Sequence, residues 1–415
     1  MTIALKPKNA EPIGMAGLLH PQRLARVIRS EQEAIDVAVA LAKDFAATAS
    51  DRDRTRAKPI AELDAFSQSG LWSINVPKEF GGSEVSYAVL AKVIEIISAA
   101  DPSIGQIPQT HLGVVAAIRT VSEPRQQQEL FAEILKGVRL GNAFSEFKSA
   151  RAADFETKFT DRGDHVVVTG KKFYSTGALF AHLVPIAALD DQGRAWYAIA
   201  NRNASGLTVL DDWSSFGQRA AFSGTTLIDN VRVPKSRLVP AYKGYDRPTA
   251  DGAIFQIIQA AVDTGIAKNA IDDTIALVRG EARAWVDSAQ EQASDDPYTI
   301  HAVGDIVLRL HAAQALLEVA GRAVDRAVAD PTQGSVAEAQ VAVAEATVLS
   351  TEAAIASTNK LFELVGARST LSDLNLDRHW RNARTHTLHD PVRWKYAMLG
   401  NYHLNGVNPP LQAWS

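Results

Sequence analysis

The period of the apolar residues changes twice along this sequence, and that change constrains the fold more than any other feature. In residues 21–65 apolar side chains recur at helical spacing, and this spacing returns three times before residue 137. From about 141 to 240 it gives way to short β-branched and apolar runs that are separated by turn residues. After residue 253 the helical spacing returns. The order along the chain is therefore helices, then strands, then helices.

We expect three packed units, because 415 residues are too many for one simple core. The units are an α-helical domain with a leading arm over 1–140, a small antiparallel β-barrel or sandwich over 141–245, and a helical bundle with a tail over 246–415. In the last unit, Asp296 before Pro297 predicts the start of a helix. The Ala- and Val-rich residues 336–356 are typical of helices that are buried against one another in a bundle.

The composition argues against several classes of partner. The chain has 43 Lys+Arg against 47 Asp+Glu and no long basic run, which disfavours nucleic acid and anionic membranes. It lacks an uncharged apolar stretch of about 18 residues, and its first ten residues lack a signal-peptide core, so we expect a cytoplasmic protein. The absence of Cys excludes disulfides and a cysteine nucleophile. With only three Met, the low sulfur content has three readings: genome drift, synthesis when sulfur is scarce, or exposure to peroxide-level oxidants.

The common metal and phosphate motifs are missing. Four of the ten His lie between 379 and 403, but their spacing completes no metal-ligand set, so we predict no metal site. The sequence contains no GxGxxG, no GxxxxGK[ST] and no nucleophile elbow.

Four other segments combine residue types that suit a ligand site. They are 141–146 (GNAFSE), 172–178 (KFYSTGA), 211–219 (DDWSSFGQR) and 386–391 (HTLHDP). The first three suit a flat polar ligand or cofactor, although turns and edge strands have the same composition. The last contains two histidines that would act as general acids near neutral pH, or would only satisfy a loop.

Taken together, these segments resemble the acyl-CoA dehydrogenase superfamily in the same order over nearly the whole chain. Residues 70–82 (GLWSINVPKEFGG) resemble its N-domain signature, and 142–146 stand where it has an Ala-x-Thr-Glu flavin strand. Residues 170–177 (GKKFYSTG) resemble its strand beside the isoalloxazine, while 217–219 and 229–234 match the Gly-x-Arg and Asp-x-Val-x-Val-Pro of its β domain. The resemblance implies an α+β fold with an N-terminal helical domain, a middle β-barrel and a C-terminal four-helix bundle, usually in a homotetramer.

Two departures from the superfamily bear on function. Where a dehydrogenase has a Tyr-Glu-Gly-Thr base, residues 384–391 read RTHTLHDP and contain no Glu. The Gln-x-x-Gly-Gly motif that grips the adenylate half of FAD is replaced by 362–368 (FELVGAR). Both changes resemble the flavin-dependent monooxygenase branch, which includes dibenzothiophene monooxygenase and the sulfone and sulfinate monooxygenases. The resemblance implies reduced FMN from a separate NAD(P)H-dependent flavin reductase, and O₂ as co-substrate through a C4a-hydroperoxyflavin.

The resemblance also implies the catalytic and substrate-binding residues. Ser175 and Asn142 would lie close to the flavin and the oxygen. His389, or else His386, would steady the hydroperoxide or supply a proton. His111 would face the substrate.

The flavin contacts are implied in the same way. Ser145 belongs to the flavin strand, and Trp213, Ser214 and Ser215 would cover the ring and the phosphate. Arg283 would reach the flavin phosphate of a neighbouring subunit, and Arg368 would add a second charge-assisted contact. From helix spacing alone, both arginines are more often surface ion pairs.

Our first hypothesis is a two-component monooxygenase that oxygenates a thiophene, sulfone or sulfinate. The alternatives are an FAD-dependent acyl-CoA dehydrogenase or oxidase, an N-hydroxylating flavin monooxygenase of the same fold, and a non-catalytic scaffold. The flavin that the protein binds distinguishes the dehydrogenase and the scaffold from the first hypothesis.

Overall fold

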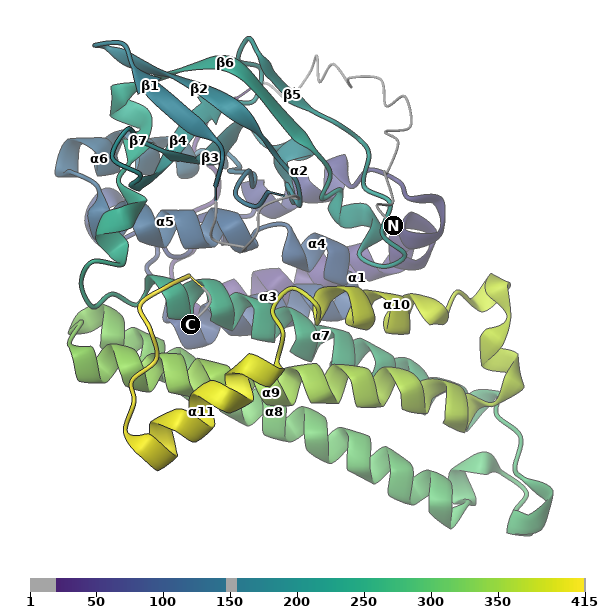
Figure 1. Cartoon of the computed structure of the whole chain (residues 1–415). Coiled ribbons are helices and arrows are strands. Elements are labelled where there is room, and N and C mark those ends of the chain that lie inside the picture. Colours follow the sequence, from purple (N-terminus) through teal and green to yellow (C-terminus); the bar gives the residue numbers. More distant parts are fainter. Residues whose placement is uncertain (1–19, 147–154, 414–415) are drawn as a thin grey trace, which may run out of the picture.

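The structure is a computed structural model that describes residues 20–146 and 155–413. The leading arm that the sequence predicts lies almost entirely outside these residues. The three-part order of helices, strands and helices is confirmed (Figure 1). The strands run from Lys158 to Val239, within the predicted middle unit, whose exact boundaries stay a prediction.

From residue 20 onward, six α-helices make up the first part of the chain. They are α1 (Glu31–Thr55), α2 (Ile60–Gln68), α3 (Tyr87–Ala100), α4 (Pro102–Gln106), α5 (Gln109–Val121) and α6 (Pro124–Ile134). Local capping explains their starts: Ser30 accepts a hydrogen bond from the Glu33 amide at the start of α1, and Asp101 caps α4 before a proline. α3 connects this domain to the third part of the chain, because it packs on α7 (Asp251–Gly280) as well as on α1.

The described residues of the middle part form one seven-stranded sheet in the order β5-β6-β2-β1-β3-β4-β7. Its strands are β1 (Lys158–Asp161), β2 (His165–Lys172), β3 (Leu183–Leu189), β4 (Ala195–Asn201), β5 (Leu207–Val209), β6 (Thr226–Pro234) and β7 (Leu238–Val239). All pairings between these seven strands are antiparallel except β1 with β3. No pairing among the described strands joins β5 to β7, so the predicted closed barrel is not confirmed.

The last part is built on three long helices, α7 (Asp251–Gly280), α8 (Pro297–Ala329) and α9 (Gln333–Val365). α8 begins as predicted, with the Asp296 side chain accepting from the Tyr298 amide and proline in the first turn. α7 is the central helix, because it packs on α8 and α9 and also on α3 and α5 of the first part. The nearest neighbours of this bundle therefore include a helix from the N-terminal part, and a separate four-helix bundle is not confirmed.

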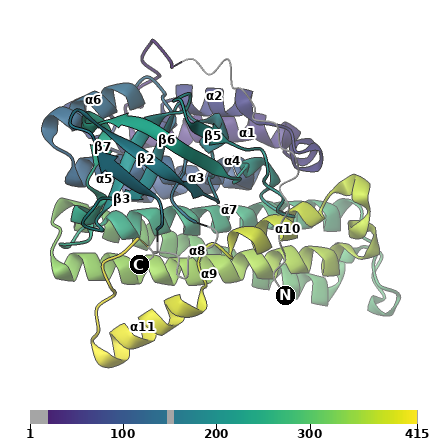
Figure 2. The same ribbon diagram turned by 45° about the horizontal axis from the view of Figure 1, so that its top comes forward.

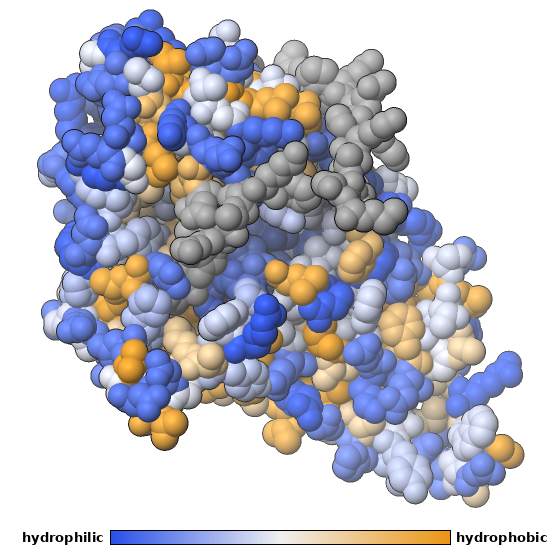
Figure 3. Space-filling model, in the orientation of Figure 1, coloured by the Kyte–Doolittle hydropathy of each residue, from blue (hydrophilic) through white to orange (hydrophobic). Residues whose placement is uncertain are grey.

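Two shorter helices, α10 (Asp377–His386) and α11 (Arg393–Asn405), follow α9. α10 lies along α7 and α9, and α11 packs on α9 after a turn in the chain (Figure 2). Exposed apolar residues are scattered over this helical half (Figure 3), and they include Trp394 and Leu404 on α11. Within the described residues no helix is long and apolar enough to cross a membrane.

Candidate active site

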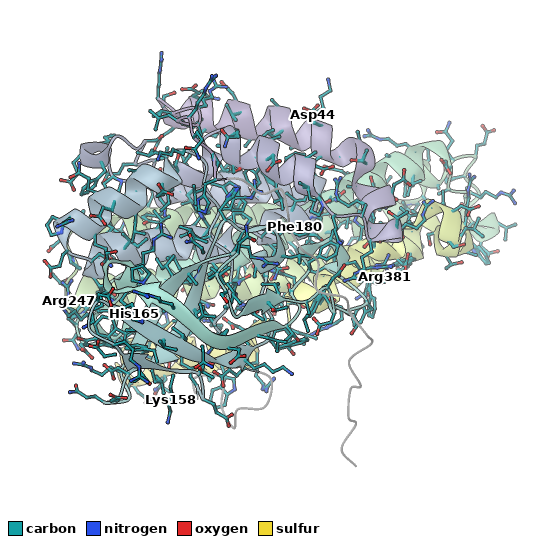
Figure 4. All side chains as sticks on the ribbon, turned by 90° about the horizontal axis from the view of Figure 1, so that it is seen from above. Asp44, Lys158, His165, Phe180, Arg247 and Arg381 are labelled. Atoms are coloured by element: carbon teal, nitrogen blue, oxygen red, sulfur yellow. The ribbon has the colours of Figure 1, made fainter. Side chains whose placement is uncertain are left out.

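α10 is held in place by buried and half-buried ion pairs that join distant parts of the chain. Arg381 bonds Asp53 at the end of α1, with Nη2 to Oδ2 at 2.7 Å, and Arg378 bonds Asp273 on α7 at 2.8 Å. Figure 4 shows Arg381 on this helix, and the fully buried Phe180 near the centre of the molecule. The first half of α10 is therefore fixed against α7 and the end of α1.

His386, the last residue of α10, forms a buried pair with Asp263 of α7. Its Nδ1 lies 2.6 Å from the Asp263 Oδ1, and both side chains are almost fully buried. The other carboxylate oxygen of Asp263 accepts a hydrogen bond from Thr351 Oγ1 at 3.2 Å. The opposite ring nitrogen, Nε2, is buried without a hydrogen-bond partner among the described residues. The carboxylate thus fixes the orientation of the ring and leaves one nitrogen available for chemistry.

His389 forms a second, more exposed pair with its neighbour Asp390, with Nδ1 3.1 Å from Oδ1. Burial opposes the charged imidazole, but the hydrogen bond to Asp390 and the charges of Asp390 and Asp263 outweigh it and raise the pKa of His389. Burial likewise acts to raise the pKa of Asp390, but the His389 hydrogen bond and charge reverse this and leave it lowered. This histidine therefore carries its proton to higher pH than an ordinary one.

Two glutamines on α7 face the same region. Gln256, Gln259 and Asp263 follow one another at intervals of three and four residues, which places them on one face of the helix. Gln256 donates to the Ala413 carbonyl at 3.2 Å and also bonds Asp390. Within 20–146 and 155–413, the amide oxygens of both glutamines and Asp390 Oδ2 are buried without a partner. Buried polar atoms are nearly always paired, so this cluster marks a place for a ligand or water.

The segment that follows β2 and contains Ser175 lies beside the segment with Asn142 and Ser145. The Phe173 amide donates to the Ser145 carbonyl at 2.9 Å, and the Asn142 amide donates to Thr176 at 3.1 Å. Ser175 is fully buried, and its hydroxyl has no partner in the described part of the chain. The structure therefore brings these three predicted residues together.

An aromatic group stands next to these segments. The ring of Trp213 lies 6.3 Å from that of Phe173 and 6.1 Å from that of Tyr174, and Tyr174 is 47% exposed. The Trp213 indole donates to the Gln218 carbonyl at 3.0 Å, which fixes its plane. Such a group offers a flat ring a surface to stack on.

The loop after Trp213 joins the sheet to α10. Ser215 Oγ lies 3.4 Å from Thr385 Oγ1, while Ser214 is exposed, and the Gln218 amide donates to Asn382 Oδ1 at 2.7 Å. Gly217 is required here, because a Cβ would lie 1.9 Å from the Arg381 carbonyl oxygen. The loop at Gly217 and α10 therefore hold each other in position.

Arg283 and Arg368 lie elsewhere, just beyond the C-terminal ends of α7 and α9. Arg368 bonds Glu281 at 2.9 Å, and Arg283 is exposed two residues further on. Asp263 precedes the end of α7 by about 25 Å along the axis, at 1.5 Å per residue. Arg283 is therefore not positioned to serve the histidine site of its own chain.

His111 occupies a different environment from the other predicted residues. It is fully buried, its Nε2 donates to the Trp72 carbonyl at 2.7 Å, and its Nδ1 accepts from the Leu140 amide at 3.1 Å. Burial lowers its pKa to about 4. Both ring nitrogens are used by the backbone, so this geometry lends no support to a substrate contact, which stays a prediction.

Sequence reasoning missed the roles of Asp263, Gln256 and Gln259. It also missed a buried ion pair at the end of β2. Lys172 is fully buried and donates to Glu146 Oε1 at 2.7 Å, which also accepts from Thr157. Burial lowers the pKa of Lys172 to about 8. The signals were polar residues inside otherwise apolar elements.

The N- and C-terminal domain models of acyl-CoA dehydrogenase match residues 29–138 and 257–394. A dibenzothiophene monooxygenase from Rhodococcus erythropolis is 33% identical, over 92% of this chain and 95% of its own length. A probable FMNH2-dependent monooxygenase from Pseudomonas putida is 31% identical, over 91% and 96%. The FMN-bound structure of TdsC, a dibenzothiophene monooxygenase from Paenibacillus sp. A11-2, is 30% identical, with a TM-score of 0.88 over 92% and 100%.

The fold and the sequence together define a member of the acyl-CoA dehydrogenase superfamily. Within it, the chain belongs to the branch of flavin-dependent monooxygenases that contains dibenzothiophene monooxygenase.

Proposed function

We propose that this protein is a two-component, FMNH₂-dependent monooxygenase that uses O₂ to oxygenate an organosulfur compound of the thiophene, sulfone or sulfinate class. Its relatives of matching length include a dibenzothiophene monooxygenase and a probable FMNH2-dependent monooxygenase. A separate NAD(P)H-dependent reductase would supply the reduced flavin. We further propose a cytoplasmic homotetramer, in which Arg283 and Arg368 of one subunit reach the flavin phosphate of another.

One observation carries the proposal: the two carboxylates beside His386 and His389 are both engaged by these histidines. Asp263 bonds His386 at 2.6 Å and Asp390 bonds His389 at 3.1 Å. An acyl-CoA dehydrogenase needs a free carboxylate to remove a proton from carbon, and the segment that would carry it contains imidazoles instead. Imidazoles suit proton donation to oxygen near neutral pH.

The residues present fit reduced FMN. The rings of Trp213, Phe173 and Tyr174 provide the flat surface, and the buried unpaired Ser175 hydroxyl provides a hydrogen-bonding atom beside it. Bound reduced FMN supplies the two electrons with which O₂ is divided between the substrate and water.

The protein's own part is to hold the substrate and to control protons and water. His389 would donate a proton to the departing oxygen, with Asp390 stabilising the charged ring. His386 Nε2, Ser175 and Asn142 would hydrogen-bond the reacting oxygen and orient it. Ser145, Ser214 and Ser215 would contact the flavin, and the loop at Gly217 would limit the access of water.

Flavin preference tests the proposal against the dehydrogenase alternative. Anaerobic titration should show tighter binding of reduced FMN than of reduced FAD, because 362–368 lack the motif that grips an adenylate. Protein purified without added flavin should be largely flavin-free. Clearly tighter FAD binding, or FAD that copurifies stoichiometrically, would favour the dehydrogenase. No binding of either flavin in either redox state would favour the scaffold.

A further inference from the structure

A polar pocket lies at the junction of the sheet with the N-terminal helices, away from His386 and His389. It measures about 460 Å³, and its lining includes His20, His182, Arg202, Asn203 and Arg237. The sheet register builds it. Leu183 pairs with Asn201, so His182 at the start of β3 stands beside Arg202 at the end of β4, and the Arg202 amide donates to the His182 carbonyl at 3.0 Å.

The main observation is that Arg202 is buried without a counter-charge among the described residues. Only 6% of this residue is exposed, and its Nε donates to the Ala178 carbonyl at 3.1 Å. No carboxylate in the described part of the chain pairs with it, whereas the similarly buried Arg52 pairs with two carboxylates and Arg139 with one. Burial alone lowers its pKa, with no neighbouring charge acting in compensation. A buried cation without a counter-charge is costly unless a ligand supplies that charge.

The neighbouring groups are donors as well. The Nδ1 of His182 accepts from the Arg139 amide at 2.9 Å, and burial lowers the pKa of His182 to about 3. The ring is therefore neutral, with its proton on Nε2. Arg237 Nη1 is held by Asn201 Oδ1 at 3.0 Å. The acidic residue of the lining, Glu133, is shared between His20 at 3.6 Å and Lys136 at 3.3 Å.

We propose that this pocket binds a tetrahedral oxyanion, either free or as the sulfonate or phosphate group of a small organic molecule, with Arg202 and Arg237 as the charged ligands and the His182 Nε2–H as a neutral donor. Guanidinium groups match such anions through paired hydrogen bonds. The volume leaves room for an organic body behind the anionic group. The observations that support this site do not depend on the proposed function.

Two hydrogen bonds connect Arg202 in this pocket to the segment that contains Ser175. Ala178, whose carbonyl Arg202 holds, donates its amide to the Ser175 carbonyl at 3.1 Å. An anion bound to Arg202 would therefore influence, through the Ala178 carbonyl, the position of the turn that follows Ser175.

Isothermal titration in a zwitterionic, chloride-free buffer tests the proposal, with sulfate, phosphate, methanesulfonate and acetate as the probes. The wild-type protein should bind at least one tetrahedral anion with millimolar or tighter affinity, and acetate at least five-fold more weakly. Arg202→Met should weaken that binding at least ten-fold, and Arg237→Met three- to ten-fold. Arg232→Met, which removes an exposed arginine of the same sheet, is the matched control and should leave it unchanged.

Arg237→Met keeps the test decisive if Arg202→Met fails to fold, because Arg237 is only half-buried. The three tetrahedral probes distinguish the sources: preference for methanesulfonate indicates an organic sulfonate, and preference for sulfate or phosphate indicates a free anion. No saturable binding, or binding that Arg237→Met and Arg232→Met weaken equally, would overturn the assignment.

Discussion

Replacing Asp263 by Asn should impair oxygen transfer while sparing the fold. The asparagine oxygen still accepts from His386 Nδ1, so the 2.6 Å contact is kept but loses its charge. A hydrogen bond to a charged group contributes about 1.5–3 kcal/mol and a neutral one about 0.5–1.5 kcal/mol. We expect the transition state to lose this difference of about 1–1.5 kcal/mol in stabilisation. The rate of product formation then falls roughly 5- to 15-fold.

The assay measures product and hydrogen peroxide separately at saturating reduced FMN. In Asp263→Asn the ratio of peroxide to product should rise, while flavin affinity and KM for the sulfur substrate stay near wild type. Asp263→Ala should be worse and also less stable, because it leaves a buried ring nitrogen unpaired at a cost of about 1–3 kcal/mol. Asp272→Asn, on the exposed side of the same helix, is the control. Unchanged coupling in Asp263→Asn would show that Asp263 only packs His386.

Three further predictions concern other residues. His389→Ala should keep flavin binding but lower product formation roughly 10²–10⁴-fold, with peroxide released instead. In the wild type, product formation should fall as the pH rises through the raised pKa of His389. An unchanged ratio of peroxide to product in His389→Ala would remove His389 from the mechanism. Arg283→Ala should weaken reduced FMN binding by about 1.5–3 kcal/mol, the scale of a charged hydrogen bond, whereas Arg279→Ala should not; equal affinities would return Arg283 to a surface role. Burial raises the pKa of Asp251 to about 6, so the folded state holds this proton more tightly than the unfolded state and loses that stability as pH rises from about 4 to above 6. Chemical unfolding should therefore find Asp251→Asn more stable than wild type by about 2–3 kcal/mol at pH 8 and by much less at pH 4, and a pH-independent difference would contradict the assignment.

Local signals made most of the fold predictable. The Asp296-Pro297 cap and the change from helical to β-branched spacing act within a few residues, and both are confirmed. Closure of the sheet depends on pairing between strands far apart in sequence. β5 and β7 have only three and two residues, too few to reveal a pairing pattern.

The candidate site divides in the same way. His386 and His389 stand in one short segment of unusual composition, so sequence alone singled them out. Asp263 is 123 residues away from His386, on a helix that is otherwise mostly apolar. Its signal was a row of polar residues, Gln256, Gln259 and Asp263, at helical spacing on a buried face, which only the fold shows to be turned toward the histidines.

The central claim is that reduced FMN and O₂ oxygenate a sulfur compound in this protein, and isotope labelling tests it most directly. The protein would be supplied with ¹⁸O₂, a separate NADH-dependent flavin reductase, FMN, and either dibenzothiophene or an alkanesulfinate. We predict an organosulfur product that gains one ¹⁸O atom per turnover and that is absent without the reductase or without FMN. Peroxide alone with every sulfur probe, or oxidation of an acyl-CoA thioester without the reductase, would contradict the claim.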